Sequence, residues 1–338
     1  MKKTVAIIAA AAASLVICAP ALSGCGGDGV KFTFSEEGGR HYIVSYSGVS
    51  AMYGEYEIPA YYGEGDLYAP VTEIADEGFA STRFSKITVP ETVTKIGTAA
   101  FSFCYSLETV QFADGIKLEK FSHGMFGEST SLQQISIPDS VKAVDALAFK
   151  GCTSLTGVEM SSVETIGVRA FEGCTALESI DLPDTLTTIG TLAFFNSGLK
   201  SVEIPDSVKD ITTVDSEGNE STVYGIGRAA FNNCLQLESV KIGNGVKVIP
   251  SGAFGYCLAL KEIHIPLSVE EVQGACYENG SFVFGHAFYY DSALTDVYFE
   301  GSEEQWKNIK IETGNLYASG ITMDNSALIN ASKHYNKI

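Results

Sequence analysis

The sequence has little positive charge, and this shortage excludes whole classes of partner. Its 338 residues include 22 Lys and Arg against 41 Asp and Glu, so the formal net charge is −19. A chain with this balance repels phosphate backbones and anionic lipid headgroups. We therefore expect no nucleic-acid partner. Apolar residues, by contrast, make up 45% of the chain, and this content excludes a disordered protein.

The motifs of common enzymes and metal sites are also missing. The sequence has no G-x-S-x-G, P-loop or dinucleotide fingerprint in a strand-to-helix context. The 5 histidines are scattered without H-E-x-x-H or paired-ligand spacing, and the 8 cysteines form no C-x-x-C pair. We therefore predict no enzymatic activity, no cofactor and no metal site.

Long apolar runs are absent as well. The run from Val5 to Ala19 has only about 15 residues and is short for a membrane-spanning helix. It follows Lys2 and Lys3, as the apolar part of a secretory signal follows a charged start. The first residues therefore predict export.

Two cleavage sites for this signal remain open. Ala19-Pro20-Ala21 resembles a small-x-small signal peptidase site, which would leave Cys25 as a stray cysteine. Leu22-Ser23-Gly24-Cys25 resembles the lipobox of bacterial lipoproteins, and we favour it because all four positions fit. This resemblance implies that Cys25 is acylated, begins the mature chain and anchors it to the bacterial cell membrane or outer surface.

A repeat of about 23 residues organises the remaining sequence. Its marker is a phenylalanine that in most copies follows Ala or Gly. The marker occurs at Phe79, Phe101, Phe126, Phe149, Phe171, Phe194, Phe231, Phe254 and Phe288. Most intervals are 22 to 25 residues long, and the two others, of 37 and 34 residues, fit one unit plus an insertion.

Each unit contains two extended pieces joined by turns. In one clean copy, the Leu-x-x-Val-x-Ile run at 199–204 alternates like a strand with one buried face, and the Leu-x-x-Ile-Gly run at 186–190 is a shorter extended piece. The Ala-Phe segment suits a single tight helical turn. Since no unit can bury its apolar residues alone, we predict a repeat solenoid, mainly β with short helical turns. Separate α/β domains would need amphipathic helices that the sequence lacks.

The unit resembles the leucine-rich repeats of the BspA-like family of bacterial surface proteins, which read approximately L-x-x-I-x-I-P-x-x-V-x-x-I-G-x-x-A-F-x-x-C. The similarity covers roughly residues 56 to 311, with Pro, Gly, Ala-Phe and Cys at the family's offsets in several copies. It implies a leucine-rich-repeat arc of about nine units with a cap at each end. It also implies a non-enzymatic role in recognition or adhesion at the cell surface.

These patterns divide the chain into segments. Because Ser302 and Gln305 have capping-box spacing, we expect a short helix carrying Trp306 to close the C-terminal end. The predicted segments are a lipoprotein signal peptide (1–24), a short tether (25–30), an N-terminal β cap (31–68), the solenoid (69–299, with insertions at 212–225 and 273–284) and a C-terminal cap and tail (300–338).

Most of the cysteines occupy one position of the repeat, three residues after the marker phenylalanine. They are Cys104, Cys152, Cys174, Cys234 and Cys257. Other copies have Thr, Ser or Asp there, so the position needs a small side chain with a modest hydrogen-bonding group. We predict a buried ladder of free thiols bonded to the turn backbone. Cys276 lies in an insertion, where we expect a more exposed thiol.

The strand piece predicts a binding face. Side chains that flank its central apolar residue point outward, onto the concave side of the arc. Candidate residues there are Glu159, Asp181, Glu203, Lys241, His264 and Tyr298. The three acidic residues would stack at about one strand spacing (~5 Å). A cationic partner or a weak Ca²⁺ contact would suit them, although a solvated ridge is the interpretation we favour.

The two insertions enter at the same phase of the repeat, two units apart. We therefore expect them to emerge on one side, about 10 Å apart, where they could form one composite site. Variation in a tolerant loop is the alternative. Candidate contacts are Asp215, Glu217, Asn219 and Tyr224 in the first insertion and Tyr277, Phe282 and Phe284 in the second.

The sequence thus favours a lipid-anchored surface module, expected to be a monomer, that binds a protein or glycan. A structural or assembly component of the cell envelope with no soluble ligand is the alternative.

Overall fold

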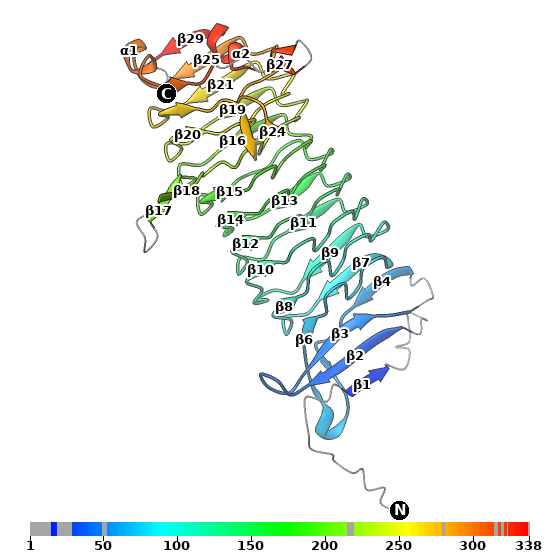
Figure 1. Ribbon diagram of the computed structural model, residues 1–338. Helices are drawn as coiled ribbons and strands as arrows, with labels where there is room; N and C mark the ends of the chain where they lie inside the picture. Colours follow the sequence, from blue (N-terminus) through cyan, green and yellow to red (C-terminus); the bar gives the residue numbers. More distant parts are fainter. Residues whose placement is uncertain are drawn as a thin grey trace, which may run out of the picture.

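The computed structural model describes residues 15–18, 29–48, 53–214, 220–278, 281–313, 317–318, 321–322 and 324–336. They form an elongated stack of repeats, with antiparallel strands at the N-terminal end and short helices at the C-terminal end (Figure 1). Strands predominate and helices are few, which confirms the predicted fold class. Within these described ranges, no helix has the length and hydropathy needed to cross a membrane.

In most repeats the first extended piece forms a strand that pairs in parallel with the equivalent strand of a neighbouring repeat. One sheet consists of β4 (Tyr53–Glu57), β7 (Arg83–Val89), β9 (Thr109–Phe112), β11 (Gln134–Ser136) and β13 (Gly157–Glu159). A second consists of β16 (Ser201–Glu203), β19 (Ser239–Lys241), β21 (Glu262–Ile265), β25 (Asp296–Phe299) and β29 (Ser332–Tyr335). We call the outward side of these two sheets the strand face. It carries the residues assigned above to the concave side, except Asp181, which lies between the two sheets.

The second extended piece forms a separate row of shorter parallel strands (Figure 1). Ile189 bridges Ile226 in parallel, which continues this row across the first insertion. The strands are β6 (Ala69–Ile74), β8 (Lys95–Ile96), β10 (Lys120–Phe121), β12 (Ala143–Val144), β14 (Thr165–Ile166), β15 (Thr188–Ile189), β20 (Val248–Ile249), β22 (Glu271–Val272) and β26 (Lys310–Ile311).

The Ala-Phe segments are hydrogen-bonded turns and contain no helix, so the tight helical turn expected there is replaced by another geometry. In most repeats the residues two before and two after the marker phenylalanine have left-handed backbone angles, as at Leu147 (φ 62°) and Gly151 (φ 72°) around Phe149. This geometry directs backbone N–H groups at the next repeat. Phe149 N donates to Ala170 O (2.8 Å), and Gly151 N donates to Glu172 O (2.7 Å). The turns therefore form a ladder of their own.

The core runs the whole length of the stack. The marker phenylalanines are fully buried, and each ring lies nearly parallel to the next. Neighbouring ring centroids are 5.9 Å apart between Phe79 and Phe101 and 5.1 Å apart between Phe149 and Phe171. One continuous hydrophobic cluster includes them together with the Leu, Ile and Val side chains of the strands, as expected for repeats that bury surface only against their neighbours.

The N-terminal end is covered by β2 (Val30–Ser35) and β3 (His41–Tyr46), which are antiparallel to each other. β3 joins the solenoid by pairing in parallel with β6. Next to them lie β5 (Tyr61–Tyr62) and the short 3-10 helix η1 (Gly65–Leu67). A further strand, β1 (Leu15–Cys18), pairs with β2. Because β1 lies inside the predicted signal peptide, cleavage before Cys25 would remove it from this sheet.

The C-terminal end begins with α1 (Glu303–Trp306), where the predicted capping box is confirmed. Gln305 N donates to Ser302 Oγ (3.3 Å), and Ser302 N donates to Gln305 Oε1 (2.9 Å). After it come the hairpin of β27 (Tyr317–Ala318) and β28 (Ile321–Thr322), α2 (Ser326–Asn330) and β29. The chain thus returns to the second sheet, where β29 pairs with β25. The sequence did not reveal this final strand.

Candidate ligand-binding surfaces

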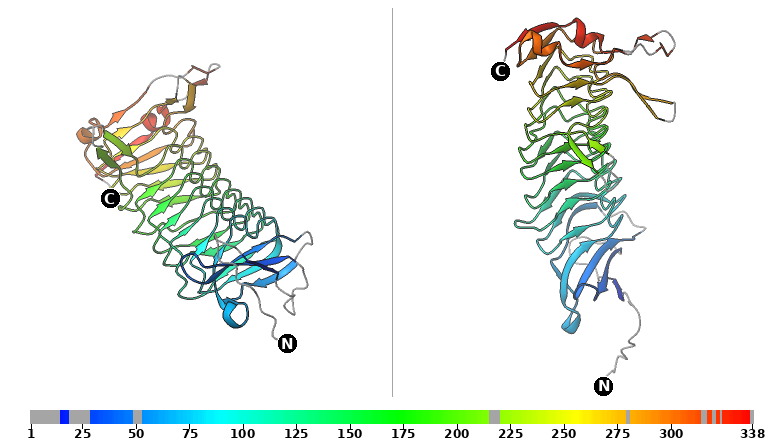
Figure 2. Two further views of the ribbon diagram at one scale, coloured as in Figure 1. Left: turned by 60° about the horizontal axis from the view of Figure 1, so that its bottom comes forward. Right: turned by 60° about the vertical axis from the view of Figure 1, so that its left-hand side comes forward.

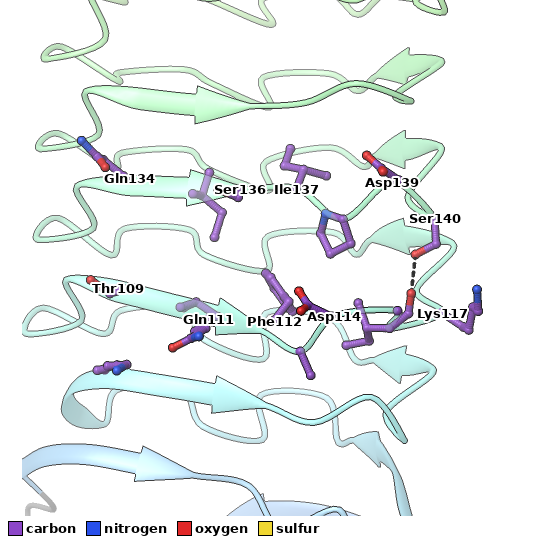
Figure 3. A pocket seen from close by; sticks show the side chains of 17 residues that line it. Thr109, Gln111, Phe112, Asp114, Lys117, Gln134, Ser136, Ile137, Asp139 and Ser140 are labelled. Carbon is purple, nitrogen blue, oxygen red and sulfur yellow. Dashed lines mark hydrogen bonds between the residues drawn. The ribbon is translucent and has the colours of Figure 1, made fainter.

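A polar hollow opens at the ends of strands β9 and β11 (Figure 3). Its volume is about 1020 Å³, and it lies between the connectors at 112–117 and 137–140. The first connector is longer than its counterparts, because the interval from Phe101 to Phe126 is 25 residues. Ser140 Oγ donates to Ile116 O (3.0 Å) and ties the two connectors together. The sequence analysis did not identify this hollow.

Three uncharged strand-face side chains border the hollow, together with Lys86 of β7, which forms an ion pair with Glu55. Thr109 and Gln134 are paired positions of β9 and β11, and Gln111 lies two residues further along β9. All three side chains are exposed, and none makes a hydrogen bond to another described residue. Half-buried Phe112 adds an aromatic ring to the lining. Exposed amides and hydroxyls without a partner can donate hydrogen bonds to a ligand and accept hydrogen bonds from it.

The three acidic side chains predicted to stack have different surroundings. Glu159, on β13, accepts a hydrogen bond from Ser136 Oγ (2.6 Å). Glu203, on β16, forms an ion pair with Lys241. Asp181 lies on the segment between the two sheets, which is not a strand. Two of the three carboxylates therefore have partners inside the fold, which weakens their attraction for an external cation.

Aromatic rings stack at the C-terminal part of the strand face. The register aligns His264, Tyr298 and His334 on β21, β25 and β29, beside Lys241 on β19. The ring centroids of His264 and Tyr298 are 4.6 Å apart, and those of Tyr298 and His334 are 4.7 Å apart. Because these rings cover one another's faces, a ligand would meet mainly their edges. His334 was not among the predicted residues, because nothing in the repeat pattern of the sequence indicated that β29 joins the sheet.

One carboxylate fixes the end of this column. His334 Nε2 lies 2.7 Å from Asp296 Oδ1. This hydrogen bond, with a second one from Thr295, holds the pKa of the Asp296 carboxyl below its usual value. The last ring of the column is therefore held in place by the neighbouring strand.

The two insertions form antiparallel hairpins whose bases touch. The first consists of β17 (Ile211–Val214) and β18 (Glu220–Val223), and the second of β23 (Cys276–Glu278) and β24 (Ser281–Phe284). Gln273 Nε2 donates to Tyr224 OH (2.9 Å) between the two bases. Beyond this contact the hairpins extend in different directions (Figures 1 and 2).

The candidate loop residues differ in their placement. Tyr277 is exposed, whereas Tyr224 and Phe284 are half-buried. Phe282 lies on β24 in register with Tyr277. The expected exposure of Cys276 is wrong, because this residue is buried at the base of its hairpin. Asp215, Glu217 and Asn219 lie outside the described residues.

The predicted cysteine ladder is confirmed. Each of the five thiols is buried and free, and each donates to the backbone oxygen of the marker phenylalanine one repeat earlier. The distance is 3.1 Å from Cys152 Sγ to Phe126 O and 3.2 Å from Cys174 Sγ to Phe149 O. Burial raises the pKa of Cys234 to about 11, so the thiolate form is disfavoured. These residues serve the fold and offer no reactive nucleophile.

Clusters suited to a metal ion are not present in the part of the chain that the structure describes. No group of three or more His, Cys, Asp or Glu side chains is arranged to hold one there. The strand face therefore offers hydrogen bonds, aromatic edges and paired charges for contact with a ligand.

The stacked parallel strands, the buried phenylalanine column and the leucine-rich units define a leucine-rich-repeat solenoid. The chain belongs to the family described as the BspA type leucine rich repeat region. Six copies of this repeat match, at residues 72–167, 116–215 and 219–313. Repeats of this kind act as protein-interaction modules. No curated protein matches the chain significantly.

Several solved structures are similar to this chain. One is a leucine rich cell surface protein from Faecalibacterium prausnitzii, with 21% identity over 88% of this chain and 100% of that one, at a TM-score of 0.48. Another is a leucine-rich repeat protein from Bacteroides ovatus, with 19% identity over 92% of this chain and 99% of that one, at a TM-score of 0.48. A third, the pneumococcal vaccine antigen PcpA, has 20% identity over 85% and 96% of the two chains, at a TM-score of 0.36.

Proposed function

We propose that this chain is an exported, lipid-anchored surface protein that recognises a ligand on its strand face and has no enzymatic activity. The family supports the recognition role, and the signal pattern ending at Cys25 supports export and anchoring. The ligand is a protein or a glycan, and the hollow beside β9 and β11 favours a glycan.

The unpaired polar groups at the hollow carry this proposal. Several strand-face side chains already have a partner inside the fold, as Lys86 has in Glu55, Ser136 in Glu159 and Lys241 in Glu203. At the hollow, Gln111 and Gln134 have no partner among the described residues. Sugar hydroxyls both donate and accept hydrogen bonds, so side-chain amides suit them well. The ring of Phe112 adds an apolar surface against which a sugar ring can pack.

Binding of the purified full chain to a glycan array and to a panel of extracellular proteins tests the proposal. We expect glycan binding that falls about tenfold or more in the triple variant T109A/Q111A/Q134A. The control S239A/E262Q changes half-buried polar side chains on the second sheet and should bind as wild type does. Equal binding by all three proteins would place the site elsewhere, and a further variant trimmed of both hairpins would then test the insertions. If neither glycans nor proteins bind, the structural role in the envelope is the better account.

The lipid anchor has its own test. Mass spectrometry of the protein isolated from its native membrane fraction should find an acylated N-terminal Cys25. A Cys25→Ala variant should lose membrane association. An unmodified N-terminus at residue 22 would contradict the anchor and leave the recognition role untouched.

A further inference from the structure

Three exposed aromatic side chains and one arginine cluster where the first strands of the solenoid begin. Tyr53 and Arg83 are the first residues of β4 and β7, and they are paired positions in the sheet. Phe103 and Tyr105 lie on the turn that leads into β9. Together with Ser81, Thr82 and Ser106, these four residues line a hollow of about 460 Å³. We call the four residues the entry cluster. They lie at the opposite end of these strands from the hollow proposed above to bind a glycan.

The entry cluster has the composition of a protein-binding hot spot. Tyr53 is 64% exposed, Phe103 46% and Tyr105 60%, whereas the marker phenylalanines are fully buried. Large aromatic side chains and arginine contribute most of the binding free energy at protein interfaces, especially when they gather around a concave point. Phe103 has no polar group with which to meet water. An apolar side chain of a partner would bury this ring.

The cluster is ordered before any partner arrives. Arg83 Nη1 donates to Tyr53 OH (2.8 Å), and the guanidinium carbon lies 5.7 Å from the centre of the Tyr53 ring. The rings of Phe103 and Tyr105 meet edge to face, with centroids 6.4 Å apart. These contacts fix the side chains, so binding would lose less side-chain entropy.

The charge of Arg83 indicates the kind of partner. Among the residues that the structure describes, no carboxylate pairs with Arg83. Lysines elsewhere on the solenoid do find one: Lys200 contacts Glu178 and Lys261 contacts Glu238, both at 2.6 Å. A guanidinium without a carboxylate partner, beside exposed rings in a chain of net charge −19, is complementary to a single acidic group surrounded by apolar ones.

Phe103 occupies a turn position that is left-handed in every repeat. Phe103 has a left-handed φ of 57°, a conformation that a bulky side chain rarely adopts. The position takes this angle whether it carries Glu128 or Gly151, because its backbone N–H donates to the next repeat, as Phe103 N does to Gly127 O (2.8 Å). The aromatic residues at this position near the C-terminal end, Tyr256 and Tyr290, stack on each other with centroids 4.7 Å apart. Phe103 instead meets Tyr105 in the entry cluster, where 46% of the residue stays exposed.

We propose that the entry cluster is a docking site for a partner protein segment that carries an acidic side chain next to an apolar one. The carboxylate would bind the guanidinium of Arg83 in the plane of its N–H groups, and the apolar side chain would pack between Phe103 and Tyr105.

Selection from a displayed library of random peptides on the purified full chain tests this docking site. Enriched peptides should share an acidic residue beside a Leu, Ile or aromatic residue. Their affinity should fall about tenfold or more in both Arg83→Gln and Phe103→Gly. Because glycine prefers a positive φ, Phe103→Gly should fold at least as stably as wild type, so that its loss of binding cannot be attributed to unfolding.

Two controls give the experiment its meaning. The variant Y61S/Y68S removes another exposed and stacked pair of tyrosines, with centroids 5.5 Å apart, and should bind the peptides unchanged. The glycan-hollow variant T109A/Q111A/Q134A should also bind them, so failure of one site is distinguishable from failure of the other. Peptides that lack acidic residues, or that bind R83Q and F103G as tightly as wild type, would overturn the proposal. The proposal would also be overturned if no peptide were enriched and a sulfated or sialylated glycan bound in a manner that depends on Arg83.

Discussion

The position three residues after each marker phenylalanine is a hydrogen-bond donor in the turn ladder. Cysteine fills it in most repeats, and Ser129 does the same by donating to Phe101 O (2.7 Å). The final copy has Asp291, which is fully buried and accepts a hydrogen bond from Cys257 N at Oδ1 (2.8 Å). Its Oδ2 has no hydrogen-bond partner among the described residues. A carboxylate cannot donate a hydrogen bond. A protonated carboxyl group can donate to Phe254 O, as the thiols donate to the phenylalanine oxygen one repeat earlier.

Asp291 makes the stability of the last repeat dependent on pH. Burial raises the pKa of its carboxyl well above the usual value in the folded protein, and the neighbouring titratable side chains are Cys257 and Tyr289. Between the ordinary Asp pKa of about 3.9 and the raised folded value, the unfolded chain binds fewer protons than the native one, so stability falls as pH rises.

The variant Asp291→Asn isolates this effect. Its amide can accept from Cys257 N and also donate, without titrating. We expect thermal melts of the variant and wild type to differ little near pH 4, and the variant to become more stable by about 1 kcal/mol or more toward pH 8. A constant difference across this pH range would contradict a protonated Asp291.

At the scale of elements, the turns are stabilised by contact with the next turn more than by their own sequence. Non-glycine residues such as Leu147, Arg169 and Leu192 take left-handed angles there. Each donates its backbone N–H to the following repeat, as Leu147 does to Val168 O (3.0 Å). Local propensity favours a helical turn for Ala-Phe, and the inter-repeat hydrogen bonds outweigh it. An isolated repeat would therefore lack this geometry.

The phenylalanine column is the element that holds neighbouring repeats together. Phe171 lies in the middle, with ring centroids 5.1 Å from Phe149 and 5.2 Å from Phe194. We expect Phe171→Ala to lower the free energy of unfolding by about 3–5 kcal/mol, because it leaves a cavity in a close-packed core. Phe171→Leu preserves more volume and should cost roughly 1–2 kcal/mol. Denaturant unfolding measures both, and equal effects of the two variants would show that the column is not closely packed.

At the scale of the whole molecule, side-chain groups close the C-terminal end of the solenoid by making the hydrogen bonds that a further repeat would make. Asn325 is fully buried beside the last turn. Its Oδ1 accepts from Phe288 N (3.1 Å), where other repeats offer a backbone oxygen. Its Nδ2 donates to Glu312 O (2.8 Å) and Gln273 O (3.2 Å). One side chain therefore joins the last turn, the second hairpin and the C-terminal cap.

Replacing Asn325 should open one end of the molecule only. Asn325→Ala removes the partner of Phe288 N and of Glu312 O, whereas Gln273 O keeps its hydrogen bond from Ala287 N, and we expect a cost of about 2–4 kcal/mol. Because each repeat contacts only its neighbours, hydrogen exchange should accelerate in the repeats around Phe254 and Phe288 and stay slow around Phe101 and Phe126. Uniform acceleration along the chain would show that the solenoid unfolds as one unit.

Much of this architecture was predictable because the same residue types recur at fixed offsets in each repeat. Apolar residues at fixed offsets predicted the stacked strands, the cysteine ladder and the capping box of α1. The candidate binding surfaces were less predictable. The entry cluster joins Tyr53, Arg83 and Phe103 from three separate units, and the glycan hollow depends on a connector only slightly longer than the others.

The sequence by itself determined the solenoid, since a repeated apolar pattern has only one way to bury itself, against its own copies. It also determined the excess of acidic residues. Only the tertiary structure decided where those acids pair with lysines, that β29 returns to the second sheet beside β25, and which polar and aromatic side chains stay without partners. The physical reason is that hydrogen bonds, ion pairs and exposure depend on distances between units that are far apart in sequence, and a local pattern does not contain these distances.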